Sequence, residues 1–478
     1  MTQPMTAITR RALLRQAAAL PVAKIATPMA LSLLGMANAA AQSASDYKAL
    51  VCVFLLGAND HYNTVIPYDQ INYDAYLNVR KGTDTGNYNG IALKKTALAA
   101  TLLNSTTGLA SGLQMALHPS MTGMKNMFDA GRAGILLNVG PMMVPTSLQQ
   151  YNARSVPLPP KLFSHNDQQA YWQTAGATEG GCSGWGGRVA DLLLSNNSKA
   201  ALSCISLSGN SVYTAGRQAL SYQMSPSGAL TVDALRTGRF FNSVECADAL
   251  RELVTKSTGS AHLMETEYVN VTNRALSLFS DLSSALSAVP AELPALFTSS
   301  TAGNSLSQQL AMVARLLHQR NTLGLKRQVY FVGLGGFDLH DNLATAHPTL
   351  LDRVSKALSE FNAALDYLGI ANQVTTFTAS DFGRTLSSNG DGSDHGWGSH
   401  HFVMGGAVNG GRFYGRAPLI GTTHGQQVGS GRLLPSTSIE QMAVELARWF
   451  GVSDTDMPGV LPYANNFDLH KLGLFKTA

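Results

Sequence analysis

The sequence predicts an α/β protein with a central, mostly parallel sheet and helices on both faces. Two observations predict it. Unbroken apolar runs without alternation are typical of strands that are buried on both faces, and such runs occupy residues 49–56, 133–139 and 329–334. The last run is followed by a helical stripe and a further apolar run at 374–378, which is the order of a βαβ unit.

The length and the charge of the chain limit the classes it can belong to. With 478 residues it can form one large α/β domain, or a domain with a sizeable insertion. Four of its 34 basic residues lie in an N-terminal segment without acids, so the rest of the chain balances the 30 acidic residues. This balance argues against a nucleic-acid partner and against a polybasic contact with a membrane.

The N-terminus predicts an export signal. Residues 9–15 hold a hydroxyl residue, two arginines, a short apolar stretch and a further arginine, which resembles the twin-arginine consensus. Two prolines and a lysine interrupt the apolar stretch that follows, so it does not predict a stable membrane span. We expect a signal peptide at 1–41, export by the twin-arginine translocase, and a periplasmic or secreted α/β domain at 42–478.

The first predicted strand ends in a polar turn. Gly57 is followed by Asn59 and Asp60, and side chains in this position lie at the edge of the sheet where α/β enzymes bind ligands. Asp60 is therefore a candidate metal ligand and Asn59 a candidate substrate contact. The alternative is that Asp60 only forms the turn.

A helix is predicted after the second strand. A proline-rich passage at 141–160 separates the two, and we expect this passage to be irregular. Ser164 precedes the helical segment, so it either caps the helix or stands where backbone N–H groups favour a bound anion. Lys161 and His165 flank this position and are candidate substrate contacts.

Three further elements are predicted in the second half of the chain, around the sheet. A strand is expected at 201–207. From about 210 to 325 the composition shifts to Ser, Ala, Leu and Thr with helical periodicity, which we interpret as a helical insertion. Near the end, Thr437 and Glu440 predict a capping box before an amphipathic helix that continues to Phe450.

Two strands end in acids. The third apolar run leads to Asp338 and His340, whose side chains point the same way if the chain stays extended. Apolar residues at three-four spacing from 351 to 368 then predict a helix that packs on the sheet. The strand at 374–378 leads to Asp381, at a position equivalent to that of Asp338. A solvated turn is the alternative for Asp338 and His340.

The loop after Asp381 is rich in side chains that bind metals. It carries Asp394, His395, His400 and His401 between two apolar runs. Burying two acids and three histidines without partners is costly, so a packed core does not favour them. We interpret the loop as a functional site held against the sheet, and the alternative is a solvated loop that happens to contain these residues.

Seven segments, which span nearly all of the chain after the signal, carry a resemblance to a known family. They are FLLGANDHYNTVIPY, FSHNDQQAYWQTA, SGWGGR, VGLGGFDLH, TASDFGRT, SDHGWGSHHFVMGGAVNGG and GRLLPSTSIEQMAVELARWFGVSD. With them the chain resembles the twin-arginine-exported "domain of unknown function 1501" family, within the alkaline phosphatase-like and sulfatase superfamily. The activity of the family is poorly defined, so the resemblance implies only the reaction type and the residue roles that are general to the superfamily.

The resemblance implies a metal-assisted transfer reaction. In the superfamily, a nucleophile at a helix N-terminus and several Asp and His residues gather one or two divalent metals that serve phosphoryl or sulfuryl transfer. By resemblance Asp60 is the first acid and Ser164 the nucleophile, with Thr146 and Ser147 as alternatives. The fold implied is that of the alkaline phosphatases and sulfatases.

The resemblance also implies metal ligands and anion-binding groups. Where the superfamily has Ser-Asp-His-Gly, this chain has Phe382 in place of the histidine, so either one metal site is altered or His395 supplies the missing imidazole. Arg384, the second candidate catalytic residue, and Lys161 would hold an anionic substrate. The expected metal ligands are Asp60, Asp338, His340, Asp381, Asp394, His395, His400 and His401.

We therefore expect an exported metal-dependent hydrolase of phosphate or sulfate esters that uses Ser164 as its nucleophile. The expected cofactor is one or two divalent ions (zinc, calcium or magnesium), and the expected substrate is a small-molecule or polymer-borne anionic ester. One alternative is a non-catalytic exported binding or assembly protein that keeps the fold. Another is a metal-dependent esterase for carboxylic esters, although the chain has no GxSxG elbow. The hydrolase hypothesis requires five places in the chain to converge: Asp60, Ser164, Asp338, Asp381 and 395–401.

Overall fold

The computed structural model describes residues 46–82, 90–176, 181–229, 233–256, 263–469 and 472–477. The signal peptide expected at 1–41 lies outside these ranges. Among the helices in these ranges, none combines the length and the apolar character that crossing a membrane requires.

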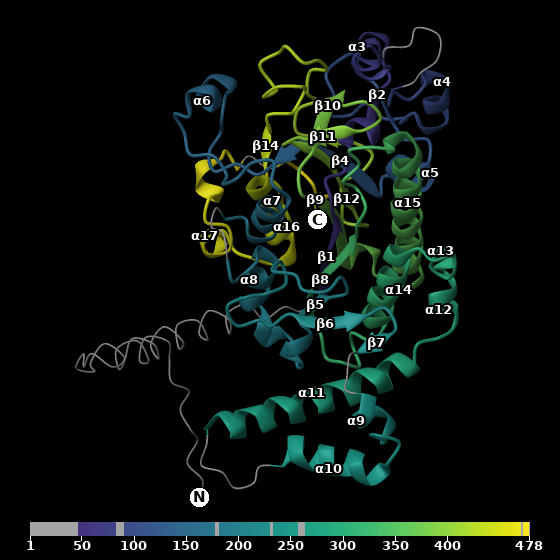
Figure 1. Cartoon of the computed structure of the whole chain (residues 1–478), viewed down its shortest axis with the longest axis vertical. Coiled ribbons are helices and arrows are strands. Elements are labelled where there is room, and N and C mark those ends of the chain that lie inside the picture. Colours follow the sequence, from purple (N-terminus) through teal and green to yellow (C-terminus); the bar gives the residue numbers. More distant parts are fainter. Residues whose placement is uncertain are drawn as a thin grey trace, which may run out of the picture. The chain divides into compact units, whose positions relative to one another are not determined.

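A ten-stranded sheet forms the centre of the protein (Figure 1). At its middle, β1 (Lys48–Leu55) pairs in parallel with β8 (Arg327–Leu334) on one side and with β9 (Val374–Ser380) on the other. Every residue of β8 and β9 is buried, so these apolar runs are strands covered on both faces, as predicted. Because the three strands are parallel, their carboxyl ends lie at the same edge of the sheet.

One central strand runs against its neighbours. β12 (Ser399–Met404) is antiparallel to both β9 and β4 (Ala133–Gly140), which leaves the sheet mostly parallel and confirms the predicted fold class. Beyond β8, the strand expected at 201–207 is shorter than predicted: β5 (Cys204–Ser206) follows the 3₁₀ turn η4 (Ala200–Leu202). The outer strands are β6 (Tyr222–Ser225), β7 (Gly228–Ala229), β13 (Phe413–Tyr414) and β14 (Thr437–Ser438).

Helices cover both faces of the sheet (Figure 1). Val51 and Val53 of β1 belong to one apolar cluster, and Cys52 and Phe54 belong to another. Successive side chains of a strand point to opposite faces, so each cluster is the core on one side of the sheet. The first core includes α5 (Thr122–Asp129), α14 (Ser305–His318) and α15 (Leu343–Tyr367), and the second includes α7 (His165–Thr174), α8 (Trp185–Asp191), α16 (Ile439–Phe450) and α17 (Met457–Val460).

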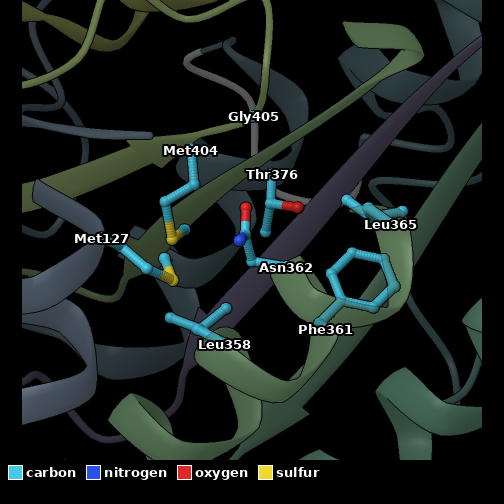
Figure 2. Close-up of a pocket in the computed structure, with 8 residues that line it drawn as sticks. All are labelled: Met127, Leu358, Phe361, Asn362, Leu365, Thr376, Met404 and Gly405. Atoms are coloured by element: carbon cyan, nitrogen blue, oxygen red, sulfur yellow. The ribbon is translucent and has the colours of Figure 1, made fainter. Parts of the chain in front are cut away.

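The first core is closely packed where α5 and α15 meet the strand ends. Figure 2 shows a pocket there, lined by Met127 of α5, Leu358 and Phe361 of α15, and Met404 of β12 among others. Its volume is about 10 Å³, and a cavity of that size holds about one water molecule at most. We interpret it as a gap in the packing and not as a ligand site.

Two local predictions were wrong. The proline-rich passage at 141–160 contains a helix, α6 (Leu148–Ala153), because its prolines all lie outside those six residues and Ser147 forms a capping box with Gln150. The capping box of α16 joins Ser438 and Gln441, one residue later than expected, because the helix begins at Ile439 and Ser438 is therefore the N-cap.

The segment at 210–325 is mainly helical in its described residues. Its last helix, α14, is part of the first core, where Leu310 and Val313 are fully buried. The boundaries of the expected insertion stay a prediction. The other helices of the segment are α9 (Asp233–Thr237), α10 (Val244–Thr255), α11 (Leu263–Ser287), α12 (Glu292–Ala295) and α13 (Thr298–Thr301).

A small hairpin extends the chain beyond the edge of the sheet. β10 (Arg384–Ser388) and β11 (Ser393–His395) pair antiparallel directly after β9, so the hairpin lies over the carboxyl ends of the central strands. It carries Asp394 and His395. The remaining elements are η1 (His61–Asn63), β2 (Val65–Pro67) paired with β3 (Met115–Leu117), α3 (Gln70–Arg80), α4 (Lys95–Leu98), η2 (Ala99–Thr101), η3 (Leu194–Asn196), η5 (Ala371–Gln373) and η6 (Ala464–Asn466).

Candidate metal centre

Three ligand-type side chains converge at the carboxyl edge of the sheet. His165 is the first residue of α7, Asp338 follows β8, and His395 ends β11. One ligand atom from each of the three lies within 4.8 Å of those of the other two. The three residues come from distant parts of the chain, and each is held by a separate element.

Neighbouring ligand atoms lie at distances close to those in the shell of one ion, and Asp338 offers one oxygen to His165 and the other to the remaining histidines. Nε2 of His165 lies 3.1 Å from Nε2 of His395 and 3.4 Å from Oδ2 of Asp338, and Nε2 of His395 lies 3.5 Å from Oδ1 of Asp338. His340 joins them, with its Nε2 2.9 Å from that of His395 and 3.1 Å from Oδ1 of Asp338. In a tetrahedral shell with bonds of about 2.0–2.1 Å, ligand atoms are about 3.3 Å apart.

The other ring nitrogen of each histidine has a partner that can only accept a hydrogen bond. Nδ1 of His165 lies 2.6 Å from Oδ2 of Asp381, Nδ1 of His395 lies 2.7 Å from the carbonyl of Phe163, and Nδ1 of His340 lies 3.3 Å from Oδ1 of Asp394. Carbonyl and carboxylate oxygens require the proton to be on Nδ1. The Nε2 atoms are then left with lone pairs, which is the arrangement found in metal-binding histidines.

This tautomer makes the cluster a fit for a cation. Lone pairs on two Nε2 atoms about 3 Å apart repel each other unless a proton or a metal ion lies between them. The hydrogen bond to Asp381 raises the pKa of His165 against the effect of burial. Burial lowers the pKa of His395, and the carbonyl of Phe163 only partly opposes this. The donor set therefore suits a metal ion.

Arg384 holds the carboxylate of the cluster in place. It is fully buried, and its Nη1 donates to Oδ1 of Asp338 at 2.9 Å and to the carbonyl of Gly57 at 3.2 Å. Burial alone would raise the pKa of Asp338, but the hydrogen bond and the charge of Arg384 outweigh it, so the pKa lies below its ordinary value. Asp338 is therefore an anion at neutral pH.

Asp381 lies beside the cluster and supports His165. It is fully buried and accepts hydrogen bonds from the backbone N–H of Gly57 at 3.2 Å and from Nε2 of Gln169 at 2.8 Å. Gly57 has a φ of 107°, and a Cβ there would lie 2.6 Å from the backbone nitrogen of Asp338, so only glycine fits. Sequence reasoning missed Gln169, although it lies four residues after His165, on the same helix face.

Ser164 and Lys161 lie at the start of α7, next to His165. Ser164 occupies the N-cap position without a capping bond from its side chain, and its Oγ donates to Oδ2 of Asp167 at 2.5 Å. Nζ of Lys161 lies 3.6 Å from Oδ1 of the same carboxylate. Asp167 was not a candidate from the sequence, although its spacing from Ser164 is that of a capping box.

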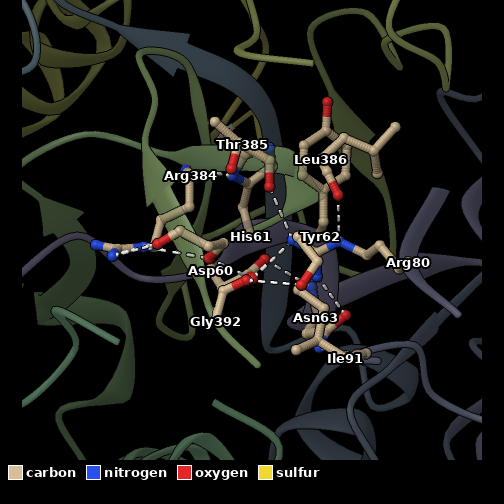
Figure 3. A network of polar contacts seen from close by, with 12 residues as sticks. Asp60, His61, Tyr62, Asn63, Arg80, Ile91, Arg384, Thr385, Leu386 and Gly392 are labelled. Carbon is tan, nitrogen blue, oxygen red and sulfur yellow. Dashed lines mark hydrogen bonds and ion pairs between the residues drawn. The ribbon is translucent and has the colours of Figure 1, made fainter. Parts of the chain in front are cut away.

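The structure places Asp60 in a buried polar network outside the cluster (Figure 3). Asn59 is also buried, and its Nδ2 donates to Oγ1 of Thr64 at 2.9 Å. Oδ2 of Asp60 lies 2.7 Å from Nη2 of Arg80, and both side chains are buried. Burial alone would raise the pKa of Asp60, but Arg80 and the neighbouring cations outweigh it and bring the pKa below its ordinary value. Asn59 accepts a hydrogen bond from Nε2 of His347 at 2.9 Å.

His400 and His401 lie in the core on β12, away from the cluster. Nδ1 of His400 accepts from the backbone N–H of Asn138 at 3.0 Å, and the ring of His401 lies 4.7 Å from that of Trp172. Burial lowers the pKa of His400 to about 4 and that of His401 to about 3, so both are neutral. Phe382, in contrast, lies at the cluster, with its ring 4.8 Å from the rings of His165 and His395.

Comparisons with known proteins identify a family and some similar folds. A family model described as "Protein of unknown function (DUF1501)" matches residues 47–457. No curated protein matches. Among solved structures, the chain is similar to the PsFucS1 sulfatase from Pseudoalteromonas sp., at 10% identity and a TM-score of 0.35, over 89% of this chain and 72% of that one. It is also similar to Ps i-CgsB in complex with k-i-k-neocarrahexaose, at 10% identity and a TM-score of 0.33, over 89% of this chain and 78% of that one.

Proposed function

The chain belongs to the DUF1501 family, and from the geometry of its site we propose that it is an exported metal-dependent hydrolase of phosphate or sulfate esters. One observation carries the proposal. The ligand atoms of His165, Asp338 and His395 lie within 4.8 Å of one another, and the Nδ1 partners of both histidines turn their Nε2 lone pairs toward that point. The arginine-rich N-terminal segment supports export.

The donor set indicates which ion the site would take. His165, His395 and Asp338 would hold it. His340 lies beside them, with its Nε2 2.9 Å from that of His395. Imidazole nitrogens favour zinc or another first-row transition ion, whereas calcium and magnesium prefer shells made of oxygen. When bound, such an ion stabilises negative charge that develops on the transferred phosphoryl or sulfuryl group.

The residues of α7 supply the nucleophile and its base in this proposal. Ser164 donates its hydroxyl proton toward Asp167 across 2.5 Å, so the carboxylate can take that proton as Oγ attacks the phosphorus or sulfur atom. The bond from that atom to the alcohol of the ester breaks, and the alcohol leaves with the proton from Asp167. Water then attacks the same atom and gives a proton to Asp167. The bond to Oγ of Ser164 breaks as Oγ takes that proton, which releases phosphate or sulfate and restores the hydroxyl. The backbone N–H groups at the start of α7 favour the anionic group during the transfer.

The proposal is tested by metal content and hydrolysis together. We expect the purified mature protein to contain a stoichiometric transition ion by elemental analysis and to hydrolyse at least one phosphate or sulfate ester. His395→Gln should lose the ion, and Ser164→Ala should keep the ion but lose about 100-fold or more in kcat. Asp366→Asn, which removes an exposed ion pair with Arg132, is the control and should change neither.

A protein that contains no metal, and whose ester hydrolysis survives Ser164→Ala, would refute the proposal. A second candidate function is an exported binding or assembly protein that keeps the metal site without turnover. The observation that favours this candidate is the short hydrogen bond from Ser164 to Asp167. In a protein without turnover, this bond would keep the hydroxyl on Asp167 and away from a substrate. Stoichiometric metal without hydrolysis across the ester panel would support the second candidate.

A further inference from the structure

We infer that a pocket beside the metal centre binds the alcohol portion of the ester, and that this portion is apolar or aromatic; the inference rests on the proposed function. The pocket has a volume of about 360 Å³, which is within the range of small-molecule sites. Five apolar residues line it: Tyr151, Leu158, Pro159, Leu162 and Phe163.

Phe163 joins the pocket directly to the metal centre. Its side chain lines the pocket, while its carbonyl accepts the hydrogen bond from Nδ1 of His395 at 2.7 Å. Its φ of 72° lies in the left-handed region, which is strained for a bulky residue. The surrounding structure therefore holds one residue in an unfavourable conformation that serves both the ligand histidine and the pocket wall.

Two further contacts tie the pocket wall to the loop that carries His395. Nε of Arg432 donates to the carbonyl of His395 at 2.7 Å, and its guanidinium carbon lies 5.5 Å from the centre of the Phe163 ring. The ring of Tyr151 lies 5.8 Å from that of Trp397, which follows His395 by two residues. The pocket wall and the candidate ligand His395 are thus joined by direct contacts.

The chemistry of the lining indicates the class of occupant. No acid lines the pocket, and its polar members are Asn152 and Arg154. A guanidinium at the rim tolerates or attracts an anionic ligand, while the apolar and aromatic walls favour a flat apolar group. An ester whose charged group faces the metal centre and whose alcohol is aromatic or apolar matches both parts of the surface.

The inference is tested by filling the pocket in the metal-loaded full-length protein. Leu158→Trp should weaken binding of the free alcohol 4-methylumbelliferone, measured by fluorescence titration, by about tenfold or more. It should lower kcat/KM for 4-methylumbelliferyl phosphate and sulfate by a similar factor, and leave methyl phosphate and methyl sulfate within about twofold. Leu419→Trp, at an exposed leucine outside the pocket, is the matched control.

The outcomes separate this inference from the proposed function. If the wild type binds 4-methylumbelliferone and Leu158→Trp abolishes that binding, the pocket is supported. This holds even if no ester is hydrolysed, because the absence of hydrolysis would refute only the proposed function. The inference is overturned if the wild-type protein does not bind the alcohol, or if Leu158→Trp lowers kcat/KM equally for the aryl and the methyl esters. In either case, hydrolysis of an ester by the wild type would still support the proposed function. If Leu158→Trp does not fold, Leu158→Ser removes the same apolar wall and should weaken alcohol binding about threefold or more.

Discussion

Two groups of polar side chains follow the central strands at the same edge of the sheet, and they differ in how their charges are satisfied. In the network around Asp60, Arg80 donates to Asp60 at 2.7 Å, to Asn63 at 2.6 Å and to the carbonyl of Leu386 at 2.9 Å (Figure 3). Both charged side chains of that network are buried. Each nitrogen of the Arg80 guanidinium has an acceptor, so its charge and that of Asp60 are satisfied within the protein.

The metal centre has the opposite arrangement. Its histidines use their Nδ1 atoms on protein acceptors, and their Nε2 atoms face one another and Asp338, where either a proton or a metal ion can lie between them. The side chains are also partly exposed, with 25% for His165 and 46% for Asp338, so a ligand can reach them. Both acids have an arginine partner, Arg80 for Asp60 and Arg384 for Asp338. Asp60 is buried, whereas Asp338 is 46% exposed and lies beside histidine nitrogens that a ligand can reach.

The largest expected effect on stability comes from breaking the buried ion pair of Asp60 and Arg80. Asp60→Asn should lower the free energy of unfolding by about 3–5 kcal/mol, because it leaves the charge of Arg80 buried without a counter-ion. Urea denaturation at pH 7 measures it. The control is Asp366→Asn at an exposed pair, which should cost about 1 kcal/mol or less. Equal losses of unfolding free energy in the two variants would show that the Asp60–Arg80 pair does not stabilise the fold more than an exposed pair does.

A third buried acid extends the comparison to a carboxyl without an arginine partner. Burial raises the pKa of Glu440 to about 7, although a hydrogen bond from Tyr171 partly opposes this. The folded state therefore binds the proton more tightly than the unfolded state. The stability from this group is complete below a pH of about 4.5 and is lost as the pH rises through about 7, by at most about 3 kcal/mol.

Glu440→Gln should remove that part of the pH dependence. We expect the variant to be more stable than the wild type above pH 7, relative to their difference at pH 4.5. Urea denaturation of both proteins from pH 4.5 to 8.5 measures this. Parallel curves over the whole range would contradict a raised pKa of Glu440 in the folded protein.

The residues that orient the metal ligands should have a smaller effect than the ligands. Asp381→Asn removes the carboxylate that accepts from Nδ1 of His165, so metal affinity should fall by about 10–100-fold. Competition with a coloured chelator at fixed pH measures the affinity. An unchanged affinity would mean that Asp381 serves only to hold Gly57 and Gln169.

The smallest effect is expected at the rim of the metal centre. Lys161 is 62% exposed and its Nζ lies 3.6 Å from Asp167, so Lys161→Ala should change the free energy of unfolding by about 0.5 kcal/mol or less. If Lys161 contacts an anionic ester, the variant should raise KM and leave kcat nearly unchanged. If Lys161→Ala lost as much stability as Asp60→Asn, the exposed pair of Lys161 and Asp167 would be as important for folding as the buried pair of Asp60 and Arg80.

The sequence alone determined the central strands, the main helices and the candidates at the strand ends. The runs at 49–56, 329–334 and 374–378 became β1, β8 and β9, because strands covered on both faces carry mainly apolar and β-branched side chains without polar alternation. The same local logic predicted the ligand candidate Asp338, since a polar residue after a buried strand lies at the sheet edge. His395 was a candidate because the loop after Asp381 is rich in side chains that bind metals.

Only the tertiary structure decided which of those candidates come together. Asp60 and Asp338 both follow central strands, but Asp60 meets Arg80 from α3, while Asp338 meets His165 from α7 and His395 from β11. Periodicity and composition report which face a side chain takes within its own element. The partners of a charge depend on contacts between separate elements, here 20 to 173 positions apart, so packing decides whether an acid is buried in an ion pair or stays exposed beside histidines.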